Sequence, residues 1–151
     1  MRVVESGLDD VRVVALLEAH VAELRATSPP ESTHVLDLDG LRAAGVRFFT
    51  ARDGDEPVGC AAVAPLEPGH VELKSMRTAS GHTGRGVGAL LVTHVLDAVR
   101  AAGVARVSLE TGSDDFFAPA RRLYARHGFV ECPPFGRYRP DPNSTFMTRT
   151  L

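Results

Sequence analysis

Three glycines at alternate positions, between an expected strand and an expected long helix, constrain this chain more than any other feature. The alternating run His70–Thr78 indicates the strand, and Gly84-Arg85-Gly86-Val87-Gly88 follows it before the helix. Glycines at the start of a helix let a ligand approach the main chain closely. The first helical N–H groups lack partners there, and the helix dipole is positive. This segment therefore predicts a binding site for a phosphate or pyrophosphate group.

Other interpretations of the glycine-rich segment are weaker. Gly84–Ala89 satisfies the G-x-G-x-x-A pattern of dinucleotide-binding units, and Glu110 lies about where a ribose-binding acid is expected. However, the preceding strand alternates polar and apolar residues, whereas a central parallel strand is almost wholly apolar. Too few residues follow to complete a doubly wound sheet, and a Walker loop would need a Lys-Ser or Lys-Thr pair. A loop that merely joins strand to helix is disfavoured, because such glycines destabilise a helix start unless a ligand needs access.

The remaining patterns predict a single mixed α/β domain over residues 1–151, in the order βααβββαβαββ. The expected strands are 2–5, 46–52, 57–66, 70–78, 104–111, 129–132 and 145–151. The expected helices are one capped by Asp9 or Asp10, a short one over 36–41, one from Gly88 to Gly103 and one from Phe117 to Gly128. The third of these helices would bury Leu90, Leu91, Val95, Ala98 and Ala102. Short connections between the three central strands favour an antiparallel meander.

Composition excludes several classes of partner. The net charge is −2 and no block of Lys and Arg occurs, so no nucleic-acid partner is expected. The apolar runs are too short to span a bilayer and the N-terminus lacks a secretory segment, which predicts a cytoplasmic protein without a membrane partner. Cys60 and Cys132 are expected to be buried, reduced thiols. The six histidines show no ligand spacing, so no metal is predicted, and only His70 lies near the functional strand.

The segment Thr83–Gly88 resembles the pyrophosphate loop of the GNAT superfamily of N-acetyltransferases, whose pattern is Gln/Arg-x-x-Gly-x-Gly/Ala. The predicted order of elements is also that of the GNAT fold, a mixed, mostly antiparallel sheet flanked by helices. Glu72–Met76 and Phe117–Phe129 resemble a subgroup of small bacterial GNAT proteins, as do residues 132–136 and 141–144. Thr83 departs from the family's Gln or Arg, and Arg137 stands where the subgroup is expected to have a smaller or acidic residue.

The resemblance implies acetyl-CoA as co-substrate and a set of residues that contact it. The expected cofactor-binding residues are Met76, Arg77, Thr78, Thr83, Gly84, Arg85, Gly86, Val87, Gly88 and Ala89. The strand around Met76 would pair with the pantetheine arm and supply an N–H to the carbonyl oxygen. Basic residues such as Arg121, Arg122 and Arg126 could meet the phosphates, although exposed helix arginines are usually only solvated.

The resemblance also suggests the catalytic groups. Glu72 is the expected general base, with Glu110 in reserve, and a pairing of Glu72 with Lys74 or Arg47 is an equally good interpretation. A carboxylate with an ordinary pKa of about 4 matches an ammonium of about 10 poorly, so a relay water or a raised carboxylate pKa is expected. Tyr124 is the expected acid facing the sulfur of CoA; the alternative is a core tyrosine.

These inferences predict an acetyl-CoA-dependent N-acetyltransferase that acts on a small amine or an amino-acid-like acceptor by direct attack. A non-catalytic acyl-CoA sensor and a protein-lysine acetyltransferase are the alternatives. The acceptor pocket is expected to draw on the first helices, on His34–Leu41 and on the loop Pro133–Asn143. Phe48, Phe49, Phe135 and Tyr138 could line it, although adjacent strand residues face opposite sides, so at least one of the first two is core. A homodimer is possible by analogy.

Overall fold

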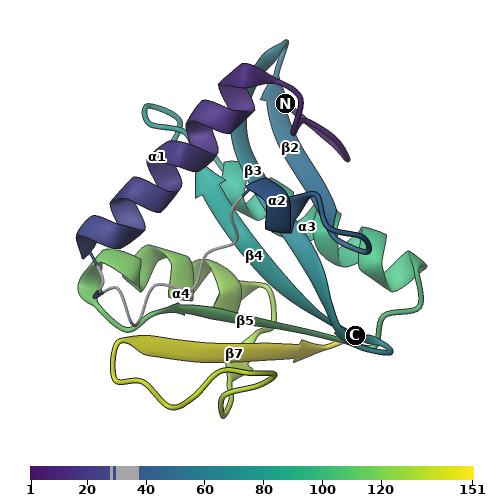
Figure 1. Cartoon of the computed structure of the whole chain (residues 1–151), viewed down its shortest axis with the longest axis vertical. Helices are drawn as coiled ribbons and strands as arrows, with labels where there is room; N and C mark the ends of the chain where they lie inside the picture. Colours follow the sequence, from purple (N-terminus) through teal and green to yellow (C-terminus); the bar gives the residue numbers. More distant parts are fainter. Residues whose placement is uncertain (28, 30–37) are drawn as a thin grey trace.

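The computed structural model describes residues 1–27, 29 and 38–151, and its elements follow the predicted order (Figure 1). The predicted mixed α/β fold class is therefore confirmed, and a 3-10 turn at Asp115–Phe117 precedes the last helix. The bounds are β1 Arg2–Val4, α1 Val11–Thr27, α2 Leu38–Leu41, β2 Arg47–Asp53, β3 Glu56–Glu67, β4 His70–Thr78, α3 Val87–Ala101, β5 Arg106–Gly112, α4 Ala118–Arg126, β6 Val130–Glu131 and β7 Ser144–Thr150.

Within the described ranges, seven strands form one sheet in the order β1-β2-β3-β4-β5-β7-β6. Strands β2, β3 and β4 form the expected antiparallel meander. The described sheet has one parallel pair, β4 and β5, and its register ends where Glu72 lies beside Ser108. Beyond that point the two strands diverge (Figure 1). The C-terminal half of β4 therefore has no partner on its β5 side among the described strands.

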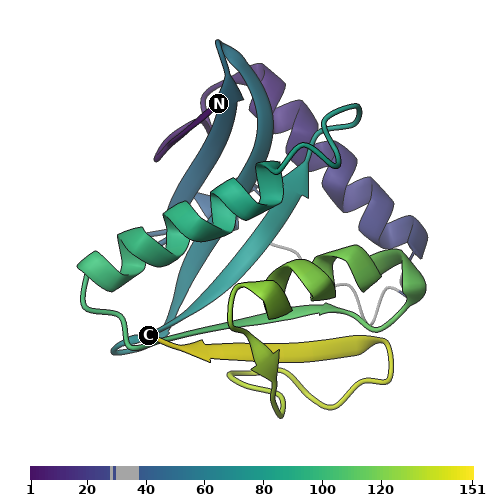
Figure 2. The same ribbon diagram turned by 180° about the vertical axis from the view of Figure 1, so that it is seen from behind.

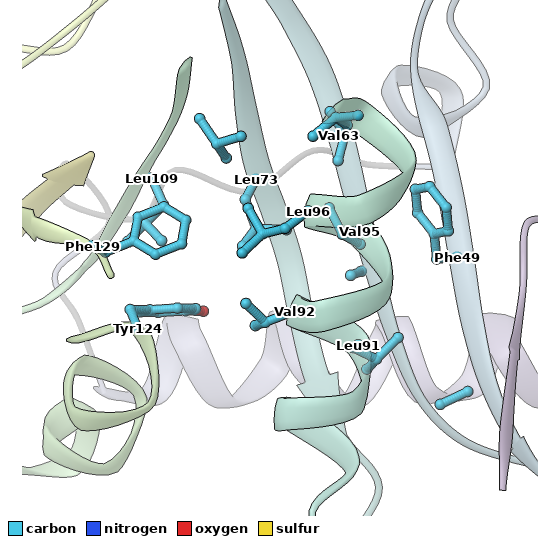
Figure 3. Packing of buried hydrophobic residues seen from close by; sticks show 14 of the residues in the cluster. Phe49, Val63, Leu73, Leu91, Val92, Val95, Leu96, Leu109, Tyr124 and Phe129 are labelled. Carbon is cyan, nitrogen blue, oxygen red and sulfur yellow. The ribbon is translucent and has the colours of Figure 1, made fainter. Parts of the chain in front are cut away.

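Two hydrophobic clusters cover the two faces of the sheet. Helices α3 and α4 lie on one face (Figure 2), and α1 and α2 lie on the other (Figure 1). Phe49 is fully buried in the larger cluster beneath α3 (Figure 3), and Phe48 is buried in the smaller one beside Leu17 and Leu41. Because alternate residues of a strand face opposite sides, these two phenylalanines anchor the two layers. Both rings belong to the core and neither is an open pocket wall.

The core face of α3 differs in part from the predicted one. Leu91 and Val95 are buried as predicted, whereas Leu90 is half-buried and Ala102 is exposed at the end of the helix. The helix begins one residue before Gly88, and its buried face is completed by Val87, Val92, Leu96 and Val99. So many of its residues are apolar that periodicity alone did not select the stripe that faces the sheet.

A β-bulge at Ser75 exchanges the faces of β4 halfway along the strand. Ser75 has a φ of 55°, and the pairing with β3 shifts between Lys74 and Arg77, so two residues of β4 oppose one of β3. Leu73 before the bulge and Met76 after it both pack on the cluster beneath α3. Arg77 consequently faces α1, where it forms an ion pair with Glu23.

Gly59 on β3 allows the start of α3 to lie close against the sheet. A Cβ atom there would be 2.6 Å from Cγ1 of Val87 and 2.9 Å from the main-chain oxygen of Arg77. Since the backbone oxygen cannot move aside cheaply, we expect Gly59→Ala to lower the free energy of unfolding by about 1–3 kcal/mol. Urea denaturation measures this effect, and a wild-type midpoint would show that the helix start adjusts freely.

The structure also bears on two exclusions drawn from composition. Both cysteines are free thiols; Cys60 is buried as expected, but Cys132 is only half-buried, because it follows the short strand β6 at the edge of the sheet. None of the described helices is long and apolar enough to cross a membrane. In the described ranges, no group of three or more His, Cys, Asp or Glu side chains is placed to hold a metal ion.

Candidate active site

The N-terminus of α3 presents a row of unpaired main-chain N–H groups. From Thr83 to Ala89, none donates a hydrogen bond to any described residue, and the first bond of the helix runs from the Leu90 N–H to the Gly86 oxygen at 3.0 Å. Gly84 and Gly86 have φ values of 76° and 82°, which glycine adopts without strain. A Cβ atom at either glycine would meet nothing within 4 Å. The N–H groups and the positive end of the helix dipole therefore suit an anion.

A pocket of about 480 Å³ opens at these groups, between α1, the end of β4, the glycine-rich loop and the start of α4. It is lined by every predicted cofactor-binding residue except Arg85, whose side chain is exposed. The predicted residues in its wall are Met76, Arg77, Thr78, Thr83, Gly84, Gly86, Val87, Gly88 and Ala89. Tyr124 lines the same pocket, so the structure brings the predicted acid and the predicted cofactor residues together.

Part of the pocket wall is polar, and of its residues Arg77 was predicted from the sequence whereas His20, Glu23 and His82 were not. Arg77 Nε and His82 Nδ1 are buried there, and neither has a hydrogen-bond partner among the residues that the structure describes. Glu23 binds the Arg77 guanidinium, and His20 lies near it on α1. Burial, followed by the charge of Arg77, lowers the pKa of His20 to about 4, so this imidazole is neutral at pH 7. No spacing in the sequence could have linked these residues, because α1 and β4 meet only in the folded protein.

Tyr124 is both a core residue and a wall of the pocket. It is 6% exposed, and its ring packs edge-on against Phe129, with 5.9 Å between the ring centroids. Its hydroxyl points away from its own helix (Figure 3) and donates no hydrogen bond to a described residue. Burial, with a smaller contribution from Glu110, raises the pKa of Tyr124. At neutral pH the phenol therefore remains protonated and can donate a proton or a hydrogen bond.

Glu72 is buried in a hydrogen-bonded cluster on β4, on the side of the sheet opposite Leu73. Its Oε2 atom accepts a hydrogen bond from the Tyr138 hydroxyl at 2.5 Å and from Lys74 Nζ at 3.2 Å. The pairing with Lys74 that the sequence left open is therefore present. Arg47, the other partner considered, binds Glu5 at 2.7 Å instead. Burial and the adjacent Glu72 charge raise the pKa of Tyr138.

Glu110, the reserve candidate for the base, lies on β5 in a different environment. The Ser144 hydroxyl donates to its Oε1 atom at 3.3 Å. Burial raises the pKa of Glu110 to about 7, although Ser144 and Lys74 act in the opposite direction. At neutral pH this carboxyl group can therefore both accept and release a proton.

Aromatic side chains from the C-terminal loop and β7 cover this polar cluster. Phe135, Tyr138 and Phe146 pack against one another with ring centroids 5.1–5.9 Å apart, and His70 lies 6.2 Å from Phe135. His70 Nε2 lies 2.6 Å from the buried hydroxyl oxygen of Ser108. Two of the predicted acceptor-site aromatics, Phe135 and Tyr138, are thus found beside the carboxylates. Of the predicted stretch His34–Leu41, residues 34–37 lie outside the described residues.

Comparison with known proteins agrees with this geometry. Residues 13–129 match the model of the acetyltransferase (GNAT) family. The chain is 44% identical to the uncharacterised N-acetyltransferase YsnE of Bacillus subtilis over 147 residues, which cover 95% of this chain and 97% of the relative. It is 40% identical to an IAA acetyltransferase of Azospirillum brasilense over 148 residues, 97% of this chain and 95% of the relative.

A solved structure of aminoglycoside 6'-N-acetyltransferase complexed with coenzyme A shares the fold. Its TM-score is 0.69 at 16% identity, with 99% of this chain and 97% of that chain covered. The family match spans most of the chain, and the relatives named as N-acetyltransferases align over nearly its whole length. The protein therefore belongs to the GNAT family of N-acetyltransferases.

Proposed function

We propose that this protein, as one domain over residues 1–151, transfers the acetyl group of acetyl-CoA to the amine of a small molecule or an amino-acid-like acceptor. Transfer occurs by direct attack within a ternary complex. The observation that carries this proposal is the row of unpaired N–H groups from Thr83 to Ala89 at the mouth of the pocket. The relatives named as N-acetyltransferases and the CoA-bound neighbour support the same chemistry.

The donors that line the pocket suit the phosphate and amide groups of coenzyme A. The main-chain donors of residues 83–89, including that of Arg85, would hold the diphosphate, and the open side of β4 at Met76 and Thr78 would hold the pantetheine arm. Arg77 Nε is a buried donor, and neither it nor the buried His82 Nδ1 has a partner among the described residues. A bound phosphate or amide oxygen would accept from Arg77 Nε, and from His82 Nδ1 in the tautomer that carries a proton there. When bound, coenzyme A supplies the acetyl group as a thioester.

The catalytic groups lie on either side of the end of β4. A main-chain N–H near Met76, just after the bulge, would donate to the carbonyl oxygen of the acetyl group. Tyr124 would donate to the departing sulfur, and a carboxylate, Glu72 or Glu110, would take a proton from the acceptor. A phenol with a raised pKa transfers its proton to a thiolate of about 8.5 only uphill, so the hydrogen bond matters more than complete transfer.

Removing the Tyr124 hydroxyl tests its assigned role. Tyr124→Phe keeps the ring on Phe129 and is expected to lower kcat about 10- to 100-fold while the Kd for acetyl-CoA stays within about threefold. Steady-state kinetics and calorimetric titration with acetyl-CoA measure the two quantities. A wild-type kcat would leave Tyr124 as a core residue only.

We expect a small-molecule acceptor and not a protein lysine, because a covered cluster of aromatic and charged side chains suits a small molecule better than an extended peptide. We further propose a cytoplasmic protein with no membrane or nucleic-acid partner, either monomeric or homodimeric. A screen of small amines and amino acids that follows thiol release from acetyl-CoA tests the proposal. Amine-dependent release of coenzyme A is the expected result. Tight acetyl-CoA binding without turnover on any amine would favour a non-catalytic sensor.

A further inference from the structure

We propose that Glu110 is the general base that takes a proton from the acceptor amine, and that Glu72 is a positioning residue. The inference rests on the proposed function and decides between two carboxylates that the resemblance left open. Four observations support it: the hydrogen bonds that Glu72 already makes, the position of Glu110 in the sheet, the Glu110 oxygen that accepts no hydrogen bond, and the burial and charges around Glu110.

The Glu72 carboxylate is already hydrogen-bonded to neighbouring side chains. One of its oxygens accepts two hydrogen bonds, from Tyr138 and from Lys74, and its side chain is only 8% exposed. Its negative charge offsets that of Lys74, whose side chain is only 12% exposed and lies over the Tyr138 ring, 5.7 Å from the centroid. If Glu72 took up a proton, it would leave a poorly hydrated ammonium without its counter-charge. Its contacts therefore fix Lys74 and the C-terminal loop in place.

Glu110 lies where the sheet opens. Ser108 is the last residue of β5 in register with β4, and Glu110 is two residues further along the same strand. Alternation puts Glu110 on the same face as Ser108, opposite Leu109, which packs beneath α3. Its carboxylate therefore projects where β4 and β5 have already separated. A substrate between the two strands would meet it.

One oxygen of the Glu110 carboxylate is free to receive a proton. Ser144 donates to Oε1 at 3.3 Å, whereas Oε2 accepts no hydrogen bond from a described residue. Within the described ranges, the unpaired side-chain atoms that have no contact with solvent are Arg77 Nε and His82 Nδ1. Oε2 of Glu110 therefore keeps some contact with solvent. Glu110 thus has an accessible acceptor atom and no cation bound to it.

Burial keeps the pKa of Glu110 high, although the two strongest effects of facing groups, from Ser144 and Lys74, lower it. Lys74 on β4 favours the carboxylate, while Glu72 on β4 and Asp141 in the C-terminal loop disfavour it. Glu110 in turn raises the pKa of Tyr124 on α4 and of Tyr138 in the loop. Burial has the largest effect, and a carboxyl pKa of about 7 matches an amine of about 10 better than the ordinary value does.

The proton and bond changes balance without a further reactant. The acceptor ammonium carries three protons on nitrogen and the product amide keeps one. Glu110 takes the first, which frees the nitrogen lone pair to form the C–N bond as the C–S bond breaks. Tyr124 gives its proton to the thiolate, and the second proton leaves the nitrogen as the amide forms and replaces, through solvent, the one that Tyr124 lost. The net result is one proton on sulfur and one that passes from Glu110 to solvent.

Kinetics on Glu110→Gln, Glu72→Gln and the exposed control Glu56→Gln test this assignment, with acetyl-CoA and the best amine from the screen. For the wild type, kcat/KM should rise with pH through an apparent pKa of about 7 and then level off. Glu110→Gln should lower kcat/KM at pH 7 about 100- to 1000-fold. This loss should become smaller as the pH approaches the pKa of the acceptor amine, because the amine then needs no base to lose its proton. Glu56→Gln should match the wild type.

Glu72→Gln should behave differently, because Glu72 raises the pKa of Glu110. We expect a loss of about tenfold or less, with the acid limb retained and moved to lower pH. In the wild type without ligand, NMR titration of ¹³C-labelled glutamate carboxyls should find one group near pH 7 that disappears in Glu110→Gln. This measurement does not depend on turnover.

Several outcomes would overturn the assignment. An acid limb near pH 7 that survives in Glu110→Gln, or that vanishes in Glu72→Gln while acetyl-CoA still binds, would show that Glu110 is not the base and favour Glu72. A Glu110 carboxyl that titrates at an ordinary value would have the same consequence. If the wild type neither binds acetyl-CoA nor releases thiol, the proposed function itself fails, and the assignment of Glu110 fails with it.

Discussion

Gly86→Asp is expected to weaken acetyl-CoA binding about 100-fold while the protein remains folded. Gly86 has a φ of 82° and is the residue before the first turn of α3, and a side chain built on it enters open space at the pocket mouth. The new carboxylate would lie close to the site proposed for the diphosphate. Repulsion between two such charges about 4 Å apart amounts to a few kcal/mol at the effective dielectric of a protein surface. Isothermal titration with acetyl-CoA measures the change in Kd.

The opposite end of the same helix offers a matched control. Gly103 has a φ of 84°, and a Cβ atom there also meets nothing within 4 Å. Gly103→Asp therefore introduces the same charge and the same backbone strain away from the pocket. It should lower stability more than Gly86→Asp, because a negative charge is unfavourable at the C-terminus of a helix, and it should leave the Kd unchanged. If both variants bind acetyl-CoA like the wild type, the diphosphate does not lie at the α3 N-terminus.

Phe49→Ala is expected to lower the free energy of unfolding by about 3–5 kcal/mol, the usual cost of deleting a buried aromatic ring. Phe49 is 0% exposed, meets the His94 ring at 5.6 Å and lies under the Arg47 guanidinium at 5.5 Å. It joins β2 to α3, so its loss leaves a cavity between sheet and helix. Chemical denaturation measures the change.

Phe116 is the control for this prediction. The residue is 52% exposed, so Phe116→Ala removes a phenyl ring without opening a core cavity. Its effect on stability should stay within about 0.5 kcal/mol. Comparable losses in both variants would mean that the cluster beneath α3 does not determine stability.

The sequence was enough to predict the order of the elements, because turns and periodicities are local signals. The glycine at position 103 ended α3 as expected, with a φ of 84°. The buried stripe of α3 was harder to predict. With apolar residues on most sides of the helix, only contact with the sheet decides that Val92 and Leu96 are core while Ala102 is exposed.

The candidate site likewise has parts that the sequence predicted and parts that only the folded chain shows. The glycine-rich loop and Tyr124 are linked to strong local motifs, and the structure brings both into one pocket. The contact of Tyr138 with Glu72 joins residues 66 positions apart, and the polar wall around Arg77 joins α1 to β4. Such contacts depend on the bulge at Ser75 and on the C-terminal loop, whose three-dimensional course no spacing rule specifies. The difference between Glu72 and Glu110 is likewise a property of burial and charge in the folded chain.

A crystal structure of the protein with bound coenzyme A would locate the diphosphate. We expect it within hydrogen-bond distance of main-chain N–H groups between Thr83 and Ala89, with the sulfur near Tyr124 and beside the open edge of β4. A diphosphate bound elsewhere, with those N–H groups turned to solvent or bonded to the protein itself, would contradict this expectation.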